Sequence, residues 1–322
     1  MFKYKVIFVA IAIVAPFIFT SNYHRELLVL TCIFALLGLS MDIIYGRMGQ
    51  ITFGHQVFFG VGAYASALLT LRLSAPIWVG FLAAIVLAGV LGLIVGYVCL
   101  RKLRAMGLAM VTFGLGTIVW LVARNWYDIT GGLSGLRNIP KPHLFGIELS
   151  SEISYYYLAL SILLVVMYFL SVSWSSRAGR ACISLRENEA LASSVGVSPI
   201  KYYTLWFAVS CSLAGLAGAL YGHHLSVVSP TLFDFQYIVA MFIVLIVGGA
   251  GTLGGPVVGA IVYIWGSELL RFSEELRFVF FGAIVLIFIV FMPKGAYPAL
   301  VSLLDRLTNF LKRRLLRGKV QW

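Results

Sequence analysis

The chain has 322 residues, of which 61% are hydrophobic and 11% are charged, and its formal net charge is +12. A soluble core of this size cannot hide so much apolar surface, so the composition excludes a water-soluble globular protein and predicts an all-α polytopic membrane protein. The basic residues are scattered between apolar runs rather than gathered on one face, which argues against nucleic-acid binding and for a charge bias across a membrane.

Ten apolar segments follow one another along the chain, and each is a candidate membrane crossing. A helix needs roughly 20 apolar residues to span the hydrocarbon layer, so we expect about 8–10 transmembrane helices, some of them short or broken. No room is left for a soluble domain, and residues 1–322 are expected to form a single transmembrane domain. The segments cover residues 6–20, 27–45, 51–71, 77–100, 105–123, 153–173, 202–222, 237–250, 256–270 and 278–292.

The distribution of Lys and Arg predicts the orientation of these segments. If the N-terminus is cytoplasmic, ten crossings place most of the 24 Lys and Arg residues on the cytoplasmic side and put both termini there. Two connections are long enough to do more than join helices, an outer loop at about 124–152 and an inner loop at about 174–201. The basic C-terminal tail, about 294–322, is expected to contact anionic membrane lipid.

Two glycine-rich segments interrupt the apolar runs, one in each half of the chain. Bare backbone and polar side chains persist at membrane depth only when they are buried in protein or line a wet cavity, so such a pair indicates a translocation path. The alternative is close helix packing through small residues. The candidate path residues are Gly49, Gln50, Gly54, His55, Gly60, Gly248 and Gly249.

Two ionisable side chains lie near the first of these segments. His55 either hydrogen-bonds a zwitterionic substrate or is an interior histidine with a partner in the protein. Asp42 lies roughly one turn from the inner end of its predicted helix. We expect its carboxylate either to extend to the membrane interface or to bind the backbone of a glycine-rich turn.

The inner loop contains a predicted short helix. Glu187 and Glu189 suit the positive N-terminal end of a helix, and Leu191 and Val195 are spaced to share one face. Gly196 is expected at the C′ position, after which Ser198 and Pro199 begin the next helix. Such a helix either docks into a partner or rests on the bilayer interface. The candidate docking residues are Arg186, Glu187, Asn188, Glu189, Leu191, Val195 and Gly196.

No feature of the chain predicts catalysis, a metal site or a cofactor. The four cysteines show no paired spacing, and the apolar runs hold too few titratable residues for an intramembrane active site. No phosphate-binding Gly-x-x-x-x-Gly-Lys-Ser/Thr loop occurs, so a separate protein must hydrolyse ATP if transport is ATP-driven. A passive channel is the alternative from another functional class.

Five stretches of the chain resemble one family of transporters. Residues 179–189 and 214–221, together with 49–64, 130–140 and 247–256, are similar to the permease subunits of branched-chain amino acid ABC importers. The resemblance extends from about residue 36 to 295. Within the family, the Thr-Gly-Gly sequence of the outer loop resembles the M-type subunit rather than its shorter H-type partner.

The resemblance implies a function, a set of partners and roles for both loops. It implies ABC importer permease architecture and ATP-driven, binding-protein-dependent import of leucine, isoleucine and valine across a bacterial inner membrane. A permease of a related urea or short-amide importer is the alternative. The implied partners are an H-type permease, two cytoplasmic ABC ATPases and a periplasmic or lipid-anchored substrate-binding protein. The inner loop becomes the coupling helix that sits in the ATPase, and the candidate contacts with the binding protein are Thr130, Gly131, Gly132 and Gly135.

Overall fold

The fold was analysed in a computed structural model that describes residues 2–19, 21–144, 147–148, 151–269, 274–303 and 305–306. Part of the predicted basic tail, residues 307–322, lies outside the described residues. The helices are α1 (Phe2–Ile18), α2 (Asn22–Asp42), α3 (His55–Arg72), α4 (Ile77–Leu100), α5 (Met106–Asn125), α6 (Tyr127–Thr130), α7 (Glu152–Ser175), α8 (Arg177–Glu187), α9 (Glu189–Ser194), α10 (Pro199–Leu225), α11 (Phe235–Gly248), α12 (Gly255–Leu269) and α13 (Glu274–Phe291).

Short elements fill the connections between these helices. A π-helical turn (Ile43–Arg47) follows α2, and two 3-10 turns cover Gly132–Ser134 and Pro230–Phe233. The strands, of two residues each, are β1 (Leu136–Arg137), β2 (His143–Leu144), β3 (Ile147–Glu148) and β4 (Val227–Val228). β1 pairs antiparallel with β4, and β2 pairs antiparallel with β3.

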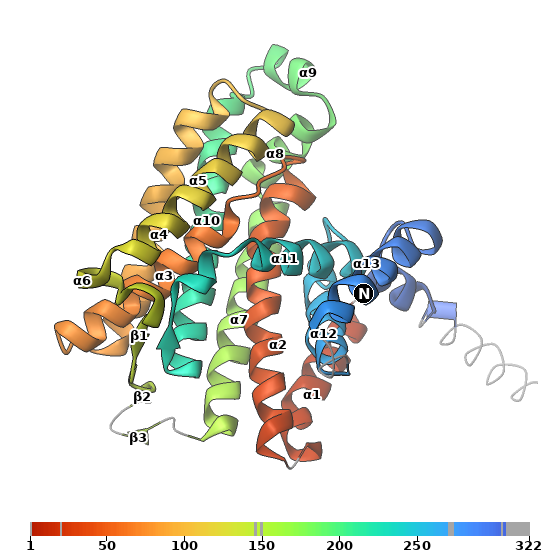
Figure 1. Cartoon of the computed structure of the whole chain (residues 1–322). Coiled ribbons are helices and arrows are strands. Elements are labelled where there is room, and N and C mark those ends of the chain that lie inside the picture. Colours follow the sequence, from red (N-terminus) through yellow and green to blue (C-terminus); the bar gives the residue numbers. More distant parts are fainter. Residues whose placement is uncertain are drawn as a thin grey trace, which may run out of the picture.

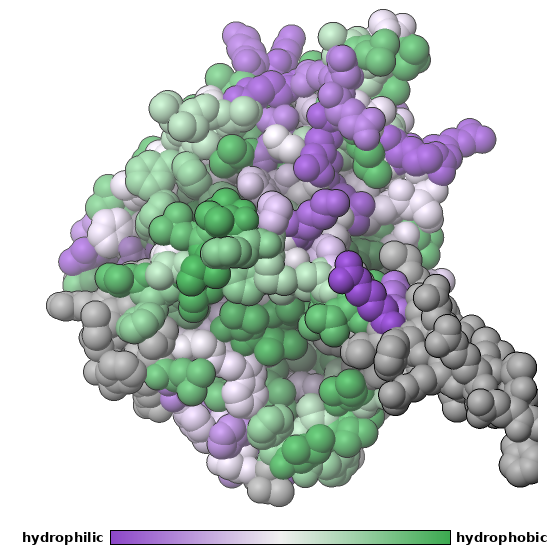
Figure 2. Space-filling model, turned by 90° about the vertical axis from the view of Figure 1, so that its right-hand side faces the viewer, coloured by the Kyte–Doolittle hydropathy of each residue, from purple (hydrophilic) through white to green (hydrophobic). Residues whose placement is uncertain are grey.

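The bundle has two distinct ends. Figure 1 shows α9 at one end and β2 and β3 at the other, with α2, α7 and α10 between them. We call the end that carries α8 and α9 the inner end and the opposite end the outer end. Figure 2 shows hydrophilic residues gathered at the inner end and a largely hydrophobic surface below it. This division matches a protein whose middle lies in a bilayer.

The expected all-α polytopic fold is confirmed. Each of the ten apolar segments forms a helix, and five spans among the described residues are long and apolar enough to cross a membrane: Asn22–Arg47, α4, α5, α7 and α10. The helices Val279–Phe291 and Ala296–Leu303, bent by 53°, add a sixth if they are counted together. α11, with only 14 residues, is apolar but shorter than these candidate spans.

The core forms around α2 and α10. Most of the apolar part of α2 is buried within the protein, which is unusual for a helix that would otherwise face lipid. Small residues bring the helices of this core into backbone contact. A side chain at Gly218 of α10 would meet the backbone of Phe59 in α3, and one at Gly62 would meet Gly215. Close approach through small residues is the usual basis of helix association in membranes.

Two helices begin part-way along the bundle rather than at one of its ends. α3 starts at His55, and its imidazole Nε2 lies 2.9 Å from the hydroxyl of Ser40, which precedes the inner end of the α2 span at Arg47. α11 starts at Phe235, and Tyr237 in its first turn stacks on Phe34 in the middle of α2 at a ring distance of 6.4 Å. Residues 48–54, the first glycine-rich break, and residues 249–254, the second glycine-rich break, lie next to these short helices.

Candidate functional site

The inner loop consists of two helices joined at Asn188. Its extended backbone (φ −156°, ψ 102°) ends α8, and its side chain accepts a hydrogen bond from the backbone N–H of Leu191 at 3.0 Å, which caps α9. Glu189 is the first residue of α9, as expected. The expected position of Glu187 at the start of the same helix is wrong. It is the last residue of α8, because the Asn188 cap separates it from α9.

The tip of α9 exposes two apolar side chains. Leu191 is 65% exposed and Val195 is 75% exposed, whereas Ala192 between them is buried. Gly196 follows with φ +88°, so the predicted C′ glycine is confirmed, and a Cβ there would meet no atom within 4 Å. Its role is therefore conformational rather than steric. The predicted helix start at Pro199 is also confirmed, although the Ser198 hydroxyl makes no capping bond.

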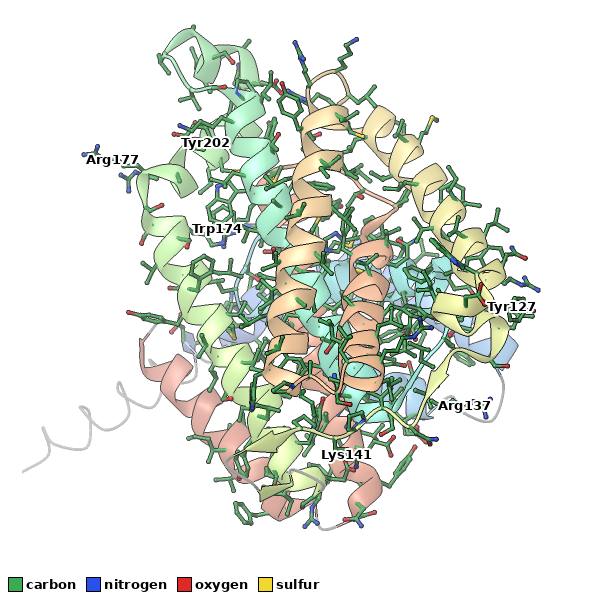
Figure 3. All side chains as sticks on the ribbon, turned by 90° about the vertical axis from the view of Figure 1, so that its left-hand side faces the viewer. Tyr127, Arg137, Lys141, Trp174, Arg177 and Tyr202 are labelled. Carbon is green, nitrogen blue, oxygen red and sulfur yellow. The ribbon has the colours of Figure 1, made fainter. Side chains whose placement is uncertain are left out.

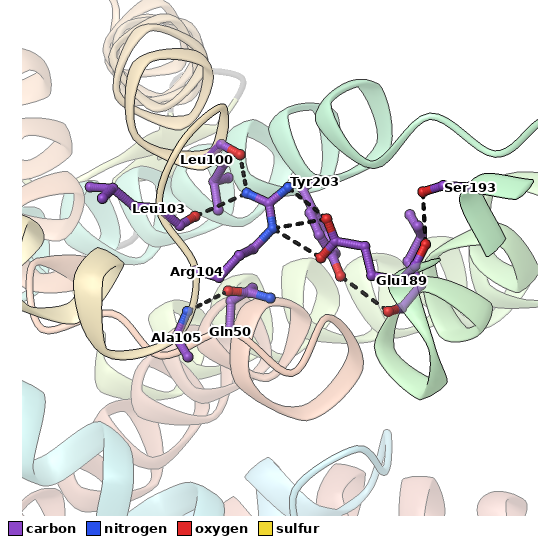
Figure 4. Close-up of polar contacts among 9 residues, drawn as sticks. Gln50, Leu100, Leu103, Arg104, Ala105, Glu189, Ser193 and Tyr203 are labelled. Carbon is purple, nitrogen blue, oxygen red and sulfur yellow. Dashed lines mark hydrogen bonds and ion pairs between the residues drawn. The ribbon is translucent and has the colours of Figure 1, made fainter. Parts of the chain in front are cut away.

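The base of α9 is held by Arg104, a residue of the turn between α4 and α5. Its guanidinium Nη2 lies 2.9 Å from one carboxylate oxygen of Glu189, and Nε lies 3.0 Å from the other (Figure 4). The same guanidinium lies over the ring of Tyr203 in α10 at 5.0 Å. Glu189 is therefore bound within the protein by Arg104. Arg104 and Tyr203 were not predicted from the sequence, because nothing in the Arg101–Arg104 charge cluster distinguishes one basic residue from its neighbours.

Another arginine, Arg186 of the inner loop, lies close to both glycine-rich breaks. Arg186 Nη1 donates a hydrogen bond to the carbonyl of Gly46 in the π-helical turn. A Cβ added at Gly49 in the first break would lie 3.0 Å from Cγ of Arg186. A Cβ added at Gly251 in the second break would lie 3.7 Å from Nη1 of Arg186. The structure thus brings together the two segments that the sequence analysis singled out and one residue of the predicted docking set.

Asp42 joins the second break to α2. Its carboxylate Oδ1 accepts a hydrogen bond from the backbone N–H of Gly251 at 2.6 Å, and its side chain is almost entirely buried. Asp42 thus binds the backbone of a glycine-rich turn, but of the second break, 209 residues away, and not of the adjacent turn that the sequence suggested. Arg47 lies on the other side of this carboxylate, with Nε 4.0 Å from Oδ2. The Arg47 guanidinium lies over Trp174 of α7 at 5.2 Å.

The polar residues of the candidate path have partners within the protein. The side-chain oxygen of Gln50 accepts a hydrogen bond from the backbone N–H of Ala105 at 2.9 Å. His55 Nε2 shares a hydrogen bond with the Ser40 hydroxyl, and Nδ1 is buried without a hydrogen-bond partner among the residues that the structure describes. Both side chains are nearly inaccessible to solvent. They hold the first break in place in this conformation.

The glycines of the candidate path are in close contacts. A Cβ at Gly54 would collide with the backbone carbonyl of Thr112 in α5, and one at Gly60 would collide with the ring of Phe233. Gly248 lies equally close to the carbonyl of Gly255. These contacts account for the three glycines by packing. Gly249 has φ +112°, a conformation that favours glycine.

The outer loop is shaped by the residues proposed to contact a binding protein. The Thr130 hydroxyl donates to the carbonyl of Ala123 at 2.6 Å and accepts from the N–H of Gly132 at 3.2 Å. Gly131, Gly132 and Gly135 have φ values of +74°, +57° and +65°. The residues between these glycines, Leu133 and Ser134, are exposed on the surface of the outer loop. Figure 3 shows Tyr127 and Arg137 on the side of the protein opposite Arg177 and Tyr202, with Arg137 further from the inner end than Tyr127.

The chain was then compared with known proteins. Residues 24–290 match the family described as branched-chain amino acid transport system / permease component. The chain belongs to this family. It is 30% identical to the high-affinity branched-chain amino acid transport system permease protein LivM of Escherichia coli (strain K12), over 92% of this chain and 75% of that protein.

Less similar proteins that match the chain are also permeases. The permease protein LivH of the same strain is 25% identical over 81% of this chain and 90% of that protein. The ribose import permease protein RbsC of Haemophilus influenzae is 24% identical over 78% of each chain. No solved structure matches the chain. The protein is thus a LivM-like permease subunit of an ABC transport system, a multi-pass membrane protein and a non-catalytic subunit.

Proposed function

We propose that the chain is the M-type permease of an ATP-driven, binding-protein-dependent importer of branched-chain amino acids. Its partners would be an H-type permease, two cytoplasmic ABC ATPases and a periplasmic or lipid-anchored substrate-binding protein. The complex would lie in a bacterial inner membrane, with both termini of this chain in the cytoplasm and residues 1–322 forming one permease domain. The exposed apolar tip of an otherwise anchored α9 is the observation that carries the coupling role.

The residues of the inner loop divide into a tip and a base. Leu191 and Val195 are large apolar side chains that point away from the protein at its hydrophilic end, which suits contact with an ATPase. Glu189 and Arg186 bind other parts of the permease, namely Arg104 and Gly46, so a displacement of the tip is transmitted to the helix bundle. Asn188 and Gly196 shape the loop between these parts. A passive channel has no need of such an element.

The translocation path is proposed to follow the first break and the start of α11. The candidate path residues of the first break would act mainly by letting α3 begin part-way along the bundle, where backbone N–H groups at the helix start attract a substrate carboxylate. Phe235 at the start of α11 is 47% exposed and lies beside Phe53 and Phe113, at ring distances of 6.4 and 5.7 Å. An exposed aromatic surface suits the branched apolar side chain of the substrate.

The outer loop is proposed to contact the binding protein. Thr130 and the three glycines of positive φ hold Leu133 and Ser134 on the surface of the outer end. The exposed Arg137 adds a basic side chain to the same surface. The role of the four candidate residues is then to position this surface rather than to supply the contact themselves.

Reconstitution tests the proposal directly. The chain is co-expressed with an H-type permease and the two ATPases from its own source, purified as a complex and placed in proteoliposomes with the binding protein. We expect ATP-dependent accumulation of labelled leucine, isoleucine and valine. Accumulation of urea or acetamide instead would favour the short-amide alternative. Leucine flux without ATP would support a passive channel and contradict the proposal.

A further inference from the structure

We infer that Asp42, Arg47 and Arg186 form a clamp that transmits movement of the inner loop to both glycine-rich breaks. All three are positioning residues, because none is argued to touch the substrate. The inference rests on the proposed function, since it specifies how the coupling helix reaches the path. It assigns this role to contacts that join α2, α8 and the connection between α11 and α12.

The side chains of the clamp lie against glycines, in the space that a side chain at those positions would need. A Cβ at Gly46 would collide with the Asp42 carboxylate and with the backbone N–H of Gly251. The aliphatic stem of Arg186 covers Gly49 in the same way. Gly46 and Gly49 therefore lie at the positions where the Asp42 and Arg186 side chains contact the backbone. The charged groups thus contribute directly to the packing around Gly46, Gly49 and Gly251.

The π-helical turn supplies the acceptor for Arg186. In this turn the N–H of Met48 bonds to the carbonyl of Ile43, and the N–H of Gln50 bonds to the carbonyl of Ile44. Gly46 lies near the end of the helix, where carbonyl groups have no partner within the helix, and its oxygen accepts from Arg186 instead. Single π-helical turns are often found at functional sites, because they are less stable than an α-helix. Movement of α8 would pull directly on this turn.

The contact between Asp42 and Arg47 is incomplete in this conformation. The 4.0 Å separation between Nε and Oδ2 exceeds a hydrogen bond, and Nε is buried without a hydrogen-bond partner among the described residues. The Asp42 carboxylate instead bonds the N–H of Gly251. Gly251 and Arg47 face different oxygens of the carboxylate, so a small shift of the π-helical turn would change the distance from Arg47 to Oδ2 and pull on the carboxylate that holds the second break.

Arg47 also links the clamp to the base of the inner loop. Its guanidinium lies over Trp174 near the inner end of α7, and Trp174 stacks on Trp206 of α10 at a ring distance of 4.3 Å. α8 starts three residues after Trp174. The π-helical turn is therefore held at two places, by Arg186 of α8 and by the aromatic pair of α7 and α10, the helices that flank the inner loop.

Substitutions at the clamp test the inference in the reconstituted complex. Arg186→Gln removes the charge and the hydrogen bond to Gly46, and Asp42→Asn keeps one oxygen for Gly251 but removes the attraction to Arg47. Arg177→Gln is the matched control, since Arg177 lies on α8 and projects away from the protein (Figure 3). We expect both clamp variants to assemble and hydrolyse ATP, while leucine transported per ATP falls at least tenfold. Arg186→Lys should recover part of that ratio.

A second readout follows the movement itself. In a background without native cysteines, Leu253→Cys places a thiol in the second break, where Leu253 is partly exposed. With the wild-type clamp, we expect ATP with vanadate to change its rate of labelling by a thiol reagent. With Arg186→Gln, we expect no change on adding nucleotide.

The outcomes separate the inference from the proposed function. If the unaltered complex does not import leucine, the proposed function fails and the clamp fails with it. If the unaltered complex works and Arg186→Gln keeps both the normal leucine to ATP ratio and the nucleotide-dependent labelling, the clamp alone is overturned. Loss of assembled complex in both clamp variants also overturns it, because the residues would then be structural only.

Discussion

Arg104 grips both carboxylate oxygens of Glu189, at 3.0 and 2.9 Å, across 85 residues of sequence. The pair fixes the first turn of α9, the proposed coupling helix, to the turn between α4 and α5. A bidentate contact of this kind fixes the orientation of the two side chains in addition to attracting them. The pair is partly exposed, so we expect about 0.2–1 kcal/mol of stability from it and a larger effect on the position of α9.

Glu189→Lys should abolish transport while the protein remains inserted and abundant. The new cation faces Arg104 and opposes the dipole of α9, each effect worth about 0.3–1 kcal/mol at a surface site. Exchange of the two charges, Glu189→Arg with Arg104→Glu, should restore part of the uptake, whereas Lys102→Glu on the same turn should leave uptake near normal. Unchanged stimulation of the ATPase by the binding protein in Glu189→Lys would contradict the coupling role.

Leu191→Asp should release the ATPases. Leu191 is 65% exposed on the tip of α9, so a charge there leaves the fold of the isolated chain intact but adds an unpaired carboxylate to an apolar interface. We expect co-purification of the ATPase to fall at least tenfold. Leu133→Asp, at a similarly exposed leucine of the outer end, should retain the ATPase. Normal co-purification with Leu191→Asp would favour a helix that rests on the bilayer interface.

Gly196→Val should impair transport for a conformational reason. Gly196 has φ +88° and no neighbour near its missing Cβ, so the substitution costs about 1–2 kcal/mol of local backbone strain without a steric clash. Gly196→Asn provides the control, because asparagine tolerates the left-handed region better than other residues. We expect uptake to fall strongly with Val and only slightly with Asn. Equal activity of the two variants would show that the α9 ending does not limit coupling.

Cysteines placed at Ser134 and Ser193 should be labelled from opposite sides of the membrane. Both positions are exposed, one on each side of the single long helix α7. Interference from native thiols is small even before their removal, since all four cysteines are buried and burial raises the pKa of the Cys182 thiol to about 12. An impermeant maleimide added to intact and to inverted vesicles measures the outcome. Labelling of both cysteines from one side would contradict the proposed orientation.

Gly60→Leu tests whether Gly60 lines the translocation path or serves helix packing. A path role predicts that Leu blocks uptake while ATPase activity persists in an assembled complex. The close approach of Phe233 to Gly60 makes the packing outcome the expected one, namely a lower yield of assembled complex. Size-exclusion chromatography of the purified complex measures that yield. Gly114→Leu is the control, since a Cβ at Gly114 meets nothing within 4 Å.

The sequence was sufficient for the features that depend on neighbours along the chain. Hydrophobic runs gave the ten helices, because apolar side chains in lipid and satisfied backbone hydrogen bonds are local requirements. The same holds for the ending of α9 at Gly196 and the start of α10 at Pro199, since left-handed backbone and the fixed φ of proline are properties of single residues. The family was also predictable, through five short stretches of similar sequence.

Only the tertiary structure decided which charged groups meet. Glu189 is paired with Arg104, and Asp42 binds a glycine 209 residues away. It also decided that α3 and α11 begin part-way along the bundle, and that Gly54 and Gly60 lie against Thr112 and Phe233. Contacts of this kind depend on the relative depth and rotation of packed helices. Those follow from the fit of many side chains at once, which no local pattern of residues encodes.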